Sequence, residues 1–192
     1  MKRCKWKNLE NHQIYMDYHD KEWGIPSYED GYLFEMIVLE SFQAGLSWLT
    51  ILNKREAFRL AFDNFDPHLI KDYDESKIKE LLADKSIIRN ENKIRATINN
   101  ALCFIKIQEE FASFSEYIWS FTNHEIVFNP DPNISKNELS ERVSRDLKKR
   151  GFKYMGSVIS YSYLEAVGIM NNHIPQCFKY SKNKIEEVEK SL

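Results

Sequence analysis

The sequence predicts an all-α fold. Three observations support this prediction: a long apolar segment at 31–44, apolar residues at helical spacing in two further segments, and capping residues at the helix boundaries. The chain has 192 residues, of which 43% are hydrophobic and 14% aromatic. This length and composition can bury a sizeable core. We therefore expect a single domain over residues 1–180, made of two closely packed helical lobes, followed by a polar tail at 181–192.

The central elements are expected to be helices. Segment 31–44 ("GYLFEMIVLESFQA") is apolar on nearly all sides, which is typical of a buried helix. Asp66 and Pro67 supply an N-cap followed by proline at the first helical position, and Ser76 is the expected cap of the next helix. Two amphipathic helices follow, separated by "ADKSIIRNEN", with apolar positions at Ile78, Leu81 and Leu82 in the first and at Ile94, Ile98, Ala101, Leu102 and Ile105 in the second.

The second half of the chain continues the helical pattern. Segment 111–121 is aromatic and predicts a short helix or a packed turn. Residues 129–140 contain two prolines and many small polar residues, which indicates a loop. Helices are expected again over "ELSERVSRDLKKRG", which ends at the C-cap candidate Gly151, and over 157–170.

Composition excludes several classes of protein. No run approaches 18 apolar residues and no apolar stretch follows the basic N-terminus, so we expect neither a membrane span nor a secretory signal, and a cytoplasmic location. Three cysteines in such a chain argue against a disulfide framework, which leaves metal binding or simple burial. A net charge of −2 means that any contact with nucleic acid must use a local basic surface.

Glu40 is a charged residue inside the apolar segment. On a helix it lies beside Met36, Ile37 and Ala44, so its carboxylate falls on an apolar stripe. Burying an unpaired carboxylate costs several kcal/mol, roughly, unless the group is paired, hydrogen-bonded or protonated. The pattern leaves two interpretations open: an internal salt bridge or cap, or a site carboxylate that meets a ligand.

Aromatic residues gather in the sequence around this glutamate. Trp6, Tyr15, Tyr18 and Trp23 fall within the first 24 residues, and Trp48 follows Glu40 by eight. Each ring alone is most simply explained by core packing. Together with a carboxylate, however, the rings can bind a flat, positively charged molecule by stacking and cation–π attraction.

The chain resembles the 3-methyladenine DNA glycosylase I family, a helical branch of the helix-hairpin-helix DNA glycosylases. The resemblance runs from about Arg3 to Tyr180. It is carried, in this order, by "RCKW", "YHDKEWG", "LFEMIVLESFQAGLSWLTILNKRE", "IIRNENKI", "LKKRGFKYMGS" and "NNH". "QAGLSW" is the most specific of these motifs.

The resemblance implies hydrolysis of the N-glycosidic bond of 3-methyladenine in alkylated DNA, which releases the base and leaves an abasic site. Such enzymes extrude the base from the stack. By resemblance, Glu40 contacts the base, and Trp6, Tyr18, Trp23 and Trp48 form an aromatic pocket; Tyr15 is assigned to the same pocket because it belongs to the aromatic cluster. A 3-methylated adenine in DNA is cationic and loses this charge on release, so charge contributes to selection. No aspartate is assigned as a water-activating group and no lysine is marked for Schiff-base chemistry, so we expect a monofunctional enzyme.

A metal site is expected at the ends of the domain. Cys4 and His19 lie near one end, and His173 and Cys177 form an H-x3-C pair near the other. Together they make a full tetrahedral Cys2His2 set for Zn²⁺, and the four positions match the structural zinc site of the family. No position remains for an activated water, so the ion is expected to join the termini. Cys103 is expected to be buried, and His12, His68 and His124 are interpreted as solvent or structural histidines.

The resemblance also assigns the contacts with DNA. Leu46 matches the side chain that fills the gap left by the flipped nucleotide; an ordinary core leucine is the alternative. Ser86, Arg89 and Lys93 belong to a hairpin that presents backbone N–H groups to phosphate. The family commonly has glycine where this chain has Ser86, and glycine tolerates positive φ more easily. The basic stretch "RVSRDLKKRGFK" is interpreted mainly as a solvated helix face.

Three other classes of protein are considered. The chain is alternatively a catalytically inactive module that binds damaged or abasic DNA, a zinc-dependent hydrolase, or a structural helical protein. The complete Cys2His2 set disfavours the hydrolase, and the buried acid among aromatics disfavours the structural protein. The expected partners are double-stranded DNA containing alkylated purines and the free 3-methyladenine product, with no membrane, and we expect a monomer.

Overall fold

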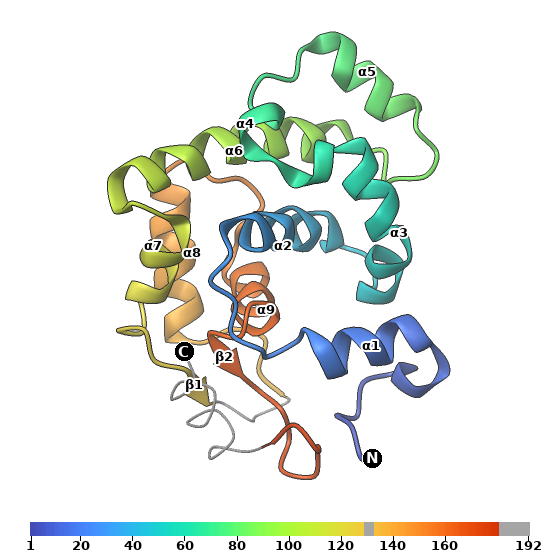
Figure 1. The fold of residues 1–192 in the computed structure, drawn as a ribbon, viewed down its shortest axis with the longest axis vertical. Coiled ribbons are helices and arrows are strands. Elements are labelled where there is room, and N and C mark those ends of the chain that lie inside the picture. The colour runs from blue at the N-terminus through green and yellow to red at the C-terminus, as the bar shows by residue number, and fades with distance from the viewer. Residues whose placement is uncertain (129–132, 181–192) are drawn as a thin grey trace.

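The computed structural model describes residues 1–128 and 133–180. The predicted polar tail at 181–192 and the first residues of the predicted loop, 129–132, lie outside the described residues. The described chain is predominantly helical, as predicted (Figure 1). Its elements are η1 (Leu9–Asn11), α1 (Gln13–Lys21), α2 (Asp30–Gln43), α3 (Trp48–Ala61), η2 (Asp63–Phe65), α4 (Pro67–Ile70), α5 (Glu75–Ala83), α6 (Glu91–Phe111), α7 (Phe114–Ser120), β1 (Val127–Phe128), α8 (Glu138–Lys149), α9 (Ser157–Ala166) and β2 (Met170–Asn171).

Helix α2 forms the centre of the core. All its residues from Leu33 to Phe42 are buried, which confirms the predicted central helix. Helices α3, α6 and α9 pack around it. Aromatic pairs fill these contacts, with Phe34 5.0 Å from Phe104 of α6 and Phe42 4.8 Å from Phe58 of α3, measured between ring centroids. The apolar pattern of 31–44 therefore reflects burial on almost every side.

Helices α5 and α6 form a helix-hairpin-helix element across residues 84–90, and both were predicted. Asn90 caps α6 by accepting a hydrogen bond from the backbone N–H of Lys93. Asp66 caps α4, with Pro67 at its first position, as expected. The predicted cap Ser76 is wrong, because α5 already begins at Glu75 and the side chain of Asp74 accepts from Lys77 N.

The C-terminal part departs from the prediction of helix over 157–170. Helix α9 ends at Ala166, and residues 170–171 pair in parallel with β1 through Val127 and Met170. Gly168 explains the break: it has φ +75°, and a Cβ at this position would lie 2.2 Å from the carbonyl carbon of Ile25. Only glycine fits this close approach.

The remaining helix predictions are confirmed. The aromatic segment contains the short helix α7, and Gly151 with φ +98° follows the end of α8. Cys103 is buried. In the part of the chain that the structure describes, no helix has the length and apolar character needed to cross a membrane.

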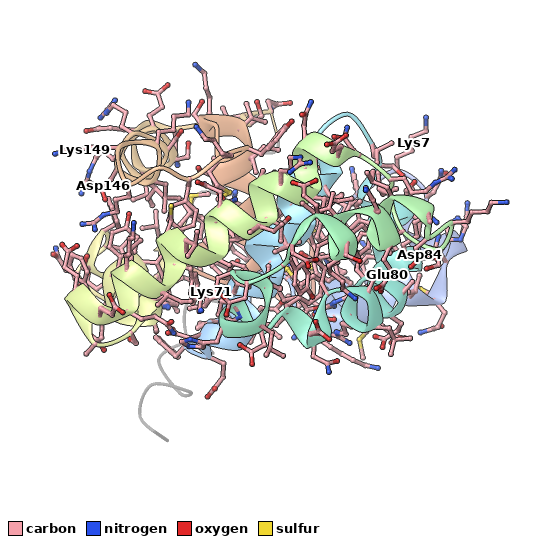
Figure 2. All side chains as sticks on the ribbon, turned by 90° about the horizontal axis from the view of Figure 1, so that it is seen from above. Lys7, Lys71, Glu80, Asp84, Asp146 and Lys149 are labelled. Atoms are coloured by element: carbon pink, nitrogen blue, oxygen red, sulfur yellow. The ribbon has the colours of Figure 1, made fainter. Side chains whose placement is uncertain are left out.

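The basic helix α8 lies far from the N-terminal segment. In Figure 2, Lys149 of α8 and Lys7 are at opposite sides of the molecule. Arg150 is already engaged by Glu110 and Asp146, at 2.7 Å in each case. Arg142, Arg145, Lys148 and Lys149 of α8 are exposed, which agrees with the interpretation of this stretch mainly as a solvated helix face.

Candidate functional site

Glu40 is buried without a charged partner. Its side chain is 3% exposed, it takes part in no ion pair among the described residues, and its Oε2 has no hydrogen-bond partner there. Burial raises the pKa of this carboxyl well above its ordinary value, and nearby Glu165 raises it further. The salt-bridge interpretation of Glu40 is therefore not supported, which leaves a carboxyl group available for a ligand.

A second buried glutamate of α2 has the opposite environment. Glu35 accepts hydrogen bonds from Arg55 Nε at 2.6 Å and from Arg59 Nε at 3.0 Å. Arg55 also donates to Glu22 at 2.7 Å. Neighbouring Glu35 and Glu22 raise the pKa of the Arg55 guanidinium against the opposing effect of burial. On α2 it is therefore Glu35, and not Glu40, that forms an internal salt bridge.

Glu40 lines a cavity of about 340 Å³. All the aromatic residues assigned to the pocket from sequence also line it: Trp6, Tyr15, Tyr18, Trp23 and Trp48. The rings form a continuous wall, because the centroid of Trp6 lies 4.6 Å from that of Trp23 and 5.3 Å from that of Tyr15. Tyr18 and Trp48 are also in contact, with their ring centroids 5.3 Å apart. The structure thus brings together residues from three separate segments of the sequence.

Two residues that line the pocket each have a buried polar atom without a partner. Glu40 Oε2 and the indole Nε1 of Trp48 are both buried, and neither has a hydrogen-bond partner among the described residues. Buried polar atoms are rarely left unpaired, and exceptions require an explanation. A flat ligand with both a donor and an acceptor at its edge has the groups that these two atoms lack.

Glu165 is a pocket residue that the sequence analysis missed. It lines the cavity from α9, together with Ser162. Burial raises the pKa of Glu165 to about 7, and a 2.7 Å hydrogen bond from Asn172 acts in the opposite direction. The signal that identified Glu40 was present here too, since Glu165 is the single charged residue in the apolar run "SVISYSYLEAVGIM". Lys7 and Gln43 also line the cavity and carried no such signal.

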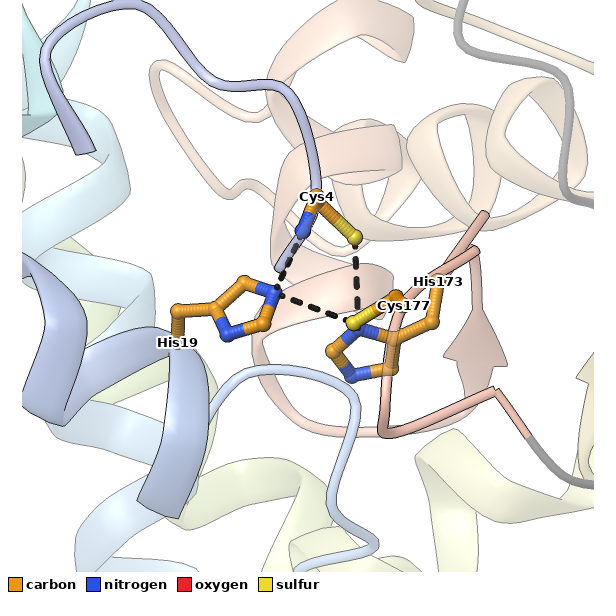
Figure 3. Close-up of side chains that lie close together, drawn as sticks. All are labelled: Cys4, His19, His173 and Cys177. Atoms are coloured by element: carbon orange, nitrogen blue, oxygen red, sulfur yellow. Dashed lines mark hydrogen bonds between the residues drawn. The ribbon is translucent and has the colours of Figure 1, made fainter. Parts of the chain in front are cut away.

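The four predicted metal ligands meet in one buried cluster (Figure 3). The candidate ligand atoms of Cys4, His19, His173 and Cys177 all lie within 4.8 Å of one another. The Sγ atoms of Cys4 and Cys177 are each 3.4 Å from His173 Nδ1, and Cys177 Sγ is 3.6 Å from His19 Nε2. The cluster joins the two ends of the described chain, and its donor set can hold a metal ion.

The outer nitrogen of each cluster histidine is held by a second residue. His19 Nδ1 is 2.8 Å from Asp20 Oδ1, and His173 Nε2 is 3.2 Å from the carbonyl oxygen of Trp23. These contacts direct the other ring nitrogen of each histidine toward the thiols, which is the usual arrangement around a metal-binding imidazole. The indole of Trp23 also packs edge-on against His173, at 4.5 Å between centroids. The cluster and the aromatic pocket therefore share a wall.

Leu46 lies in the tight turn between α2 and α3. Gly45 with φ +85° opens this turn, and the Leu46 N–H donates to the carbonyl of Gln43 at 2.7 Å. Ser47 then caps α3. The Leu46 side chain is 38% exposed, so it is not the core leucine of the alternative interpretation.

The hairpin presents Ser86 and Arg89 at the surface, since both residues are exposed. Ser86 is not among the residues with positive φ, and both its N–H and its hydroxyl donate to Asp84, at 2.8 and 2.6 Å. The hairpin therefore has no need of glycine at this position. Whether it contacts phosphate stays a prediction.

Lys93 does not lie where the sequence prediction required. It is 7% exposed, and its Nζ donates to the carbonyl oxygens of Phe42 at 2.9 Å and Ala44 at 2.8 Å. Lys93 lies on the first turn of α6, which faces the end of α2. Its ammonium group is therefore bound inside the protein, and a contact of the hairpin backbone with phosphate stays a prediction.

The fold and the site together define a class: a helical protein with a helix-hairpin-helix element and an acid-containing aromatic pocket beside a Cys2His2 cluster. The family model of methyladenine glycosylase matches residues 6–180. This chain belongs to the methyladenine glycosylase family.

Individual relatives agree over nearly the whole chain. DNA-3-methyladenine glycosylase 1 of Escherichia coli is 40% identical over 188 residues, which cover 96% of this chain and all of the relative. A crystal structure of 3-methyladenine DNA glycosylase I superposes with a TM-score of 0.89 at 39% identity, covering 94% of this chain and 100% of the other. A variant of 3-methyladenine DNA glycosylase I, solved in complex with 3-methyladenine, has a TM-score of 0.86 at 34% identity, covering 92% and 99%.

Proposed function

We propose that this chain is a DNA-3-methyladenine glycosylase that removes 3-methyladenine from alkylated DNA by hydrolysing its N-glycosidic bond. The observation that carries the proposal is the presence of two buried polar atoms without partners, Glu40 Oε2 and Trp48 Nε1, on residues that line a cavity with aromatic walls. A methylated adenine fits this arrangement because it is flat, carries hydrogen-bonding groups at its edge and is cationic while attached to DNA. Family membership and the complex of a relative with 3-methyladenine support the same substrate.

The charge of the substrate supplies both selection and reactivity. When the bond between the sugar and the base breaks, the base takes the bonding electron pair and becomes neutral, while the oxygen of a water molecule bonds to the sugar carbon and its proton passes to solvent. The pocket rings attract the cation before this step by cation–π interaction. The released base has lost its charge and binds less strongly. This lower affinity for the neutral base favours release of the product.

The protonation state of Glu40 depends on the charge of the bound base. In the empty pocket, burial favours its neutral form. A bound cation favours the carboxylate, because an opposite charge nearby lowers a carboxyl pKa. Entry of the methylated base therefore drives Glu40 toward its charged form, whereas a normal, neutral adenine gives no such gain. Glu40 acts in binding and orientation, and no residue is assigned to activate the water.

Contacts with double-stranded DNA are proposed for the surface near the pocket. Leu46 is the wedge that fills the space of the flipped nucleotide. Ser86 and Arg89 lie on the exposed hairpin, where the Arg89 guanidinium can meet phosphate oxygens. The N–H and hydroxyl of Ser86 donate to Asp84, so a contact between Ser86 and phosphate would replace these two hydrogen bonds. The chain is proposed to act as a monomer.

Zinc is the metal proposed for the Cys2His2 cluster. Zn–S bonds of about 2.3 Å and Zn–N bonds of about 2.0 Å at a tetrahedral ion separate sulfur and nitrogen ligands by about 3.5 Å. The three shortest observed separations, 3.4, 3.4 and 3.6 Å, match this value, and all four ligand atoms lie within 4.8 Å of one another, so the widest pairs must draw together around the ion. The four residues fill the coordination of the ion, so its contribution is to hold the chain ends and the Trp23 wall in place.

Metal analysis tests this proposal. Natively purified protein is expected to contain about one zinc ion per chain. Cys4→Ser should lower the melting temperature, while folded Cys4→Ser protein retains base excision. Buried Cys103 offers the control, since Cys103→Ser leaves the metal content unchanged. Native protein without zinc would contradict the assignment.

The activity is tested with methylated DNA. Incubation followed by chromatography of the released bases should show 3-methyladenine, and the DNA strand should remain uncut until the abasic site is cleaved chemically. Trp48→Phe keeps a ring in the wall but removes the unpartnered N–H, so it should weaken binding of free 3-methyladenine. Binding of abasic DNA without release of any base would instead favour the inactive binding module.

A further inference from the structure

Two lysines connect the elements that carry the proposed wedge and the proposed phosphate contacts. Lys93 begins the second helix of the hairpin element, and its ammonium group binds the carbonyl oxygens of Phe42 and Ala44. These carbonyls end α2, directly before the turn that carries Leu46. In the other direction, Lys54 of α3 donates from Nζ to the carbonyl oxygen of Ser86 in the hairpin at 2.7 Å.

We infer that Lys93 and Lys54 are positioning residues that fix the Leu46 turn and the hairpin as one rigid DNA-binding unit. The inference rests on the proposed glycosylase function and assigns to Lys93 a role other than contact with phosphate. Lys93 belongs to the hairpin element and binds two carbonyl oxygens at the end of α2, and Lys54 belongs to α3, which follows the turn, and binds one carbonyl oxygen of the hairpin. A movement of the hairpin relative to the turn must therefore break a hydrogen bond.

The burial of Lys93 supports a role inside the protein. A lysine is almost never fully buried unless it is paired. Here the ammonium group is paired with the carbonyl oxygens at the C-terminal end of α2, where the helix dipole favours a cation. Burial lowers the pKa of Lys93. The ring of Tyr154 lies 5.9 Å from Nζ and offers a further favourable contact.

The backbone of Lys93 is fixed as well. Its N–H donates to the capping side chain of Asn90 at 3.1 Å, and its carbonyl accepts from the hydroxyl of Thr97 at 2.9 Å. The first turn of α6 is thus held at the position from which the ammonium group reaches α2. Any phosphate bound by the hairpin is consequently placed at a fixed distance from Leu46.

The inference is tested by separating base binding from DNA binding. Lys93→Met keeps most of the apolar stem and removes both hydrogen bonds to α2. We expect its affinity for a duplex with an abasic site to fall about tenfold, comparable to the loss of one charge-assisted hydrogen bond. Its affinity for free 3-methyladenine should stay within about twofold of the parent, because the pocket residues are untouched. Excision at saturating DNA concentration should also fall, since the wedge is no longer held.

Salt dependence distinguishes positioning from phosphate contact. Each phosphate contact contributes about −0.9 to the slope of log affinity against log salt concentration. Arg89→Met should make this slope shallower by about one contact, whereas Lys93→Met should leave it unchanged. A slope reduced by Lys93→Met as much as by Arg89→Met would restore the phosphate contact and overturn the inference.

Matched variants keep the test decisive. Lys106→Met places the same substitution at an exposed position of the same helix and should match the parent in every measurement. Lys54→Met removes the second tie at an exposed site and should lower abasic-DNA affinity about threefold, with the same split. If Lys93→Met fails to fold, Lys54→Met decides alone, and an unchanged affinity for abasic DNA would overturn the inference. If the parent itself releases no 3-methyladenine, the proposed function fails, and this result is distinct from either outcome.

Discussion

Glu35 and Glu40 lie on the same helix and are both buried, yet one faces the arginines of α3 and the other faces the aromatic pocket. Glu35 accepts hydrogen bonds from Arg55 and Arg59, and Glu40 has an oxygen with no partner in the described structure. Five residues of α-helix rotate a side chain by about 140°, so the two carboxyls point to different sides of α2. One helix thus carries a structural acid and a binding acid.

The comparison shows what separates the two kinds of buried acid. A carboxylate that pairs inside the protein stabilises the fold through its partner, and removal of its charge leaves that partner unpaired. A carboxyl without a partner destabilises the fold and keeps its capacity for a ligand. Removal of the charge should therefore lower stability but not activity at Glu35, and lower activity but not stability at Glu40.

The largest effect is expected at Glu35. Glu35→Gln leaves the buried Arg55 with only the partly exposed Glu22, and the free energy of unfolding should fall by about 3 kcal/mol. Protein that remains folded should release 3-methyladenine at nearly the parent rate. Chemical denaturation measures the first quantity and base chromatography the second. Glu56→Gln is the control, because the exposed Glu56 pairs with Arg59 at the surface and should change stability by less than about 1 kcal/mol.

The second effect is expected at Glu40, and it concerns activity. Glu40→Gln should slow release of 3-methyladenine about 100-fold, which corresponds to about 3 kcal/mol for a lost charge-assisted hydrogen bond. The fold should tolerate the change, and stability should rise by about 1 kcal/mol above neutral pH because a neutral amide is easier to bury. A Glu40→Gln protein that melts much lower and excises the base at the parent rate would make Glu40 a structural residue like Glu35.

The smallest effect is expected at Glu165, and it concerns pH. The pKa of this carboxyl is about 7 in the folded protein, above its ordinary value of 4.5. The folded state therefore binds the proton more tightly, so this group contributes stability at low pH that is lost as pH rises from about 4.5 through about 7. Glu165→Gln should make the decline in melting temperature over this range shallower. The exposed Glu109→Gln should leave the decline as steep as in the parent.

The sequence alone predicted the pocket better than the contacts behind it. Glu40 and its five aromatic neighbours were identified, because a charge on an apolar face is visible in a helical pattern and the motifs of the family assign the rings. The Cys2His2 set was also predicted, because its residue types form a tetrahedral donor set and its positions match the family. The central helix and the hairpin helices followed from apolar periodicity.

What the sequence left open depends on tertiary neighbours. Glu35 and Glu40 have similar local surroundings in sequence, and only the packing of α3 against α2 gives Glu35 its arginines. Lys93 looked like a surface residue because its burial comes from the end of α2, many residues away. The short strand pair was missed, since two residues per strand give no detectable alternation.

The Cys2His2 cluster also combines residues from the beginning and the end of synthesis. A ribosome makes Cys4 and the pocket residue Trp6 first, and His173 follows 169 residues after Cys4. Until His173 and Cys177 emerge, the cluster holds the Trp6 segment only through the 3.3 Å hydrogen bond from the Cys4 N–H to His19, and its set of four ligands is incomplete. A chain that ends before α9 also lacks Ser162 and Glu165, which line the pocket. The complete pocket lining and the complete Cys2His2 set are thus present only after translation has reached the far end of the domain.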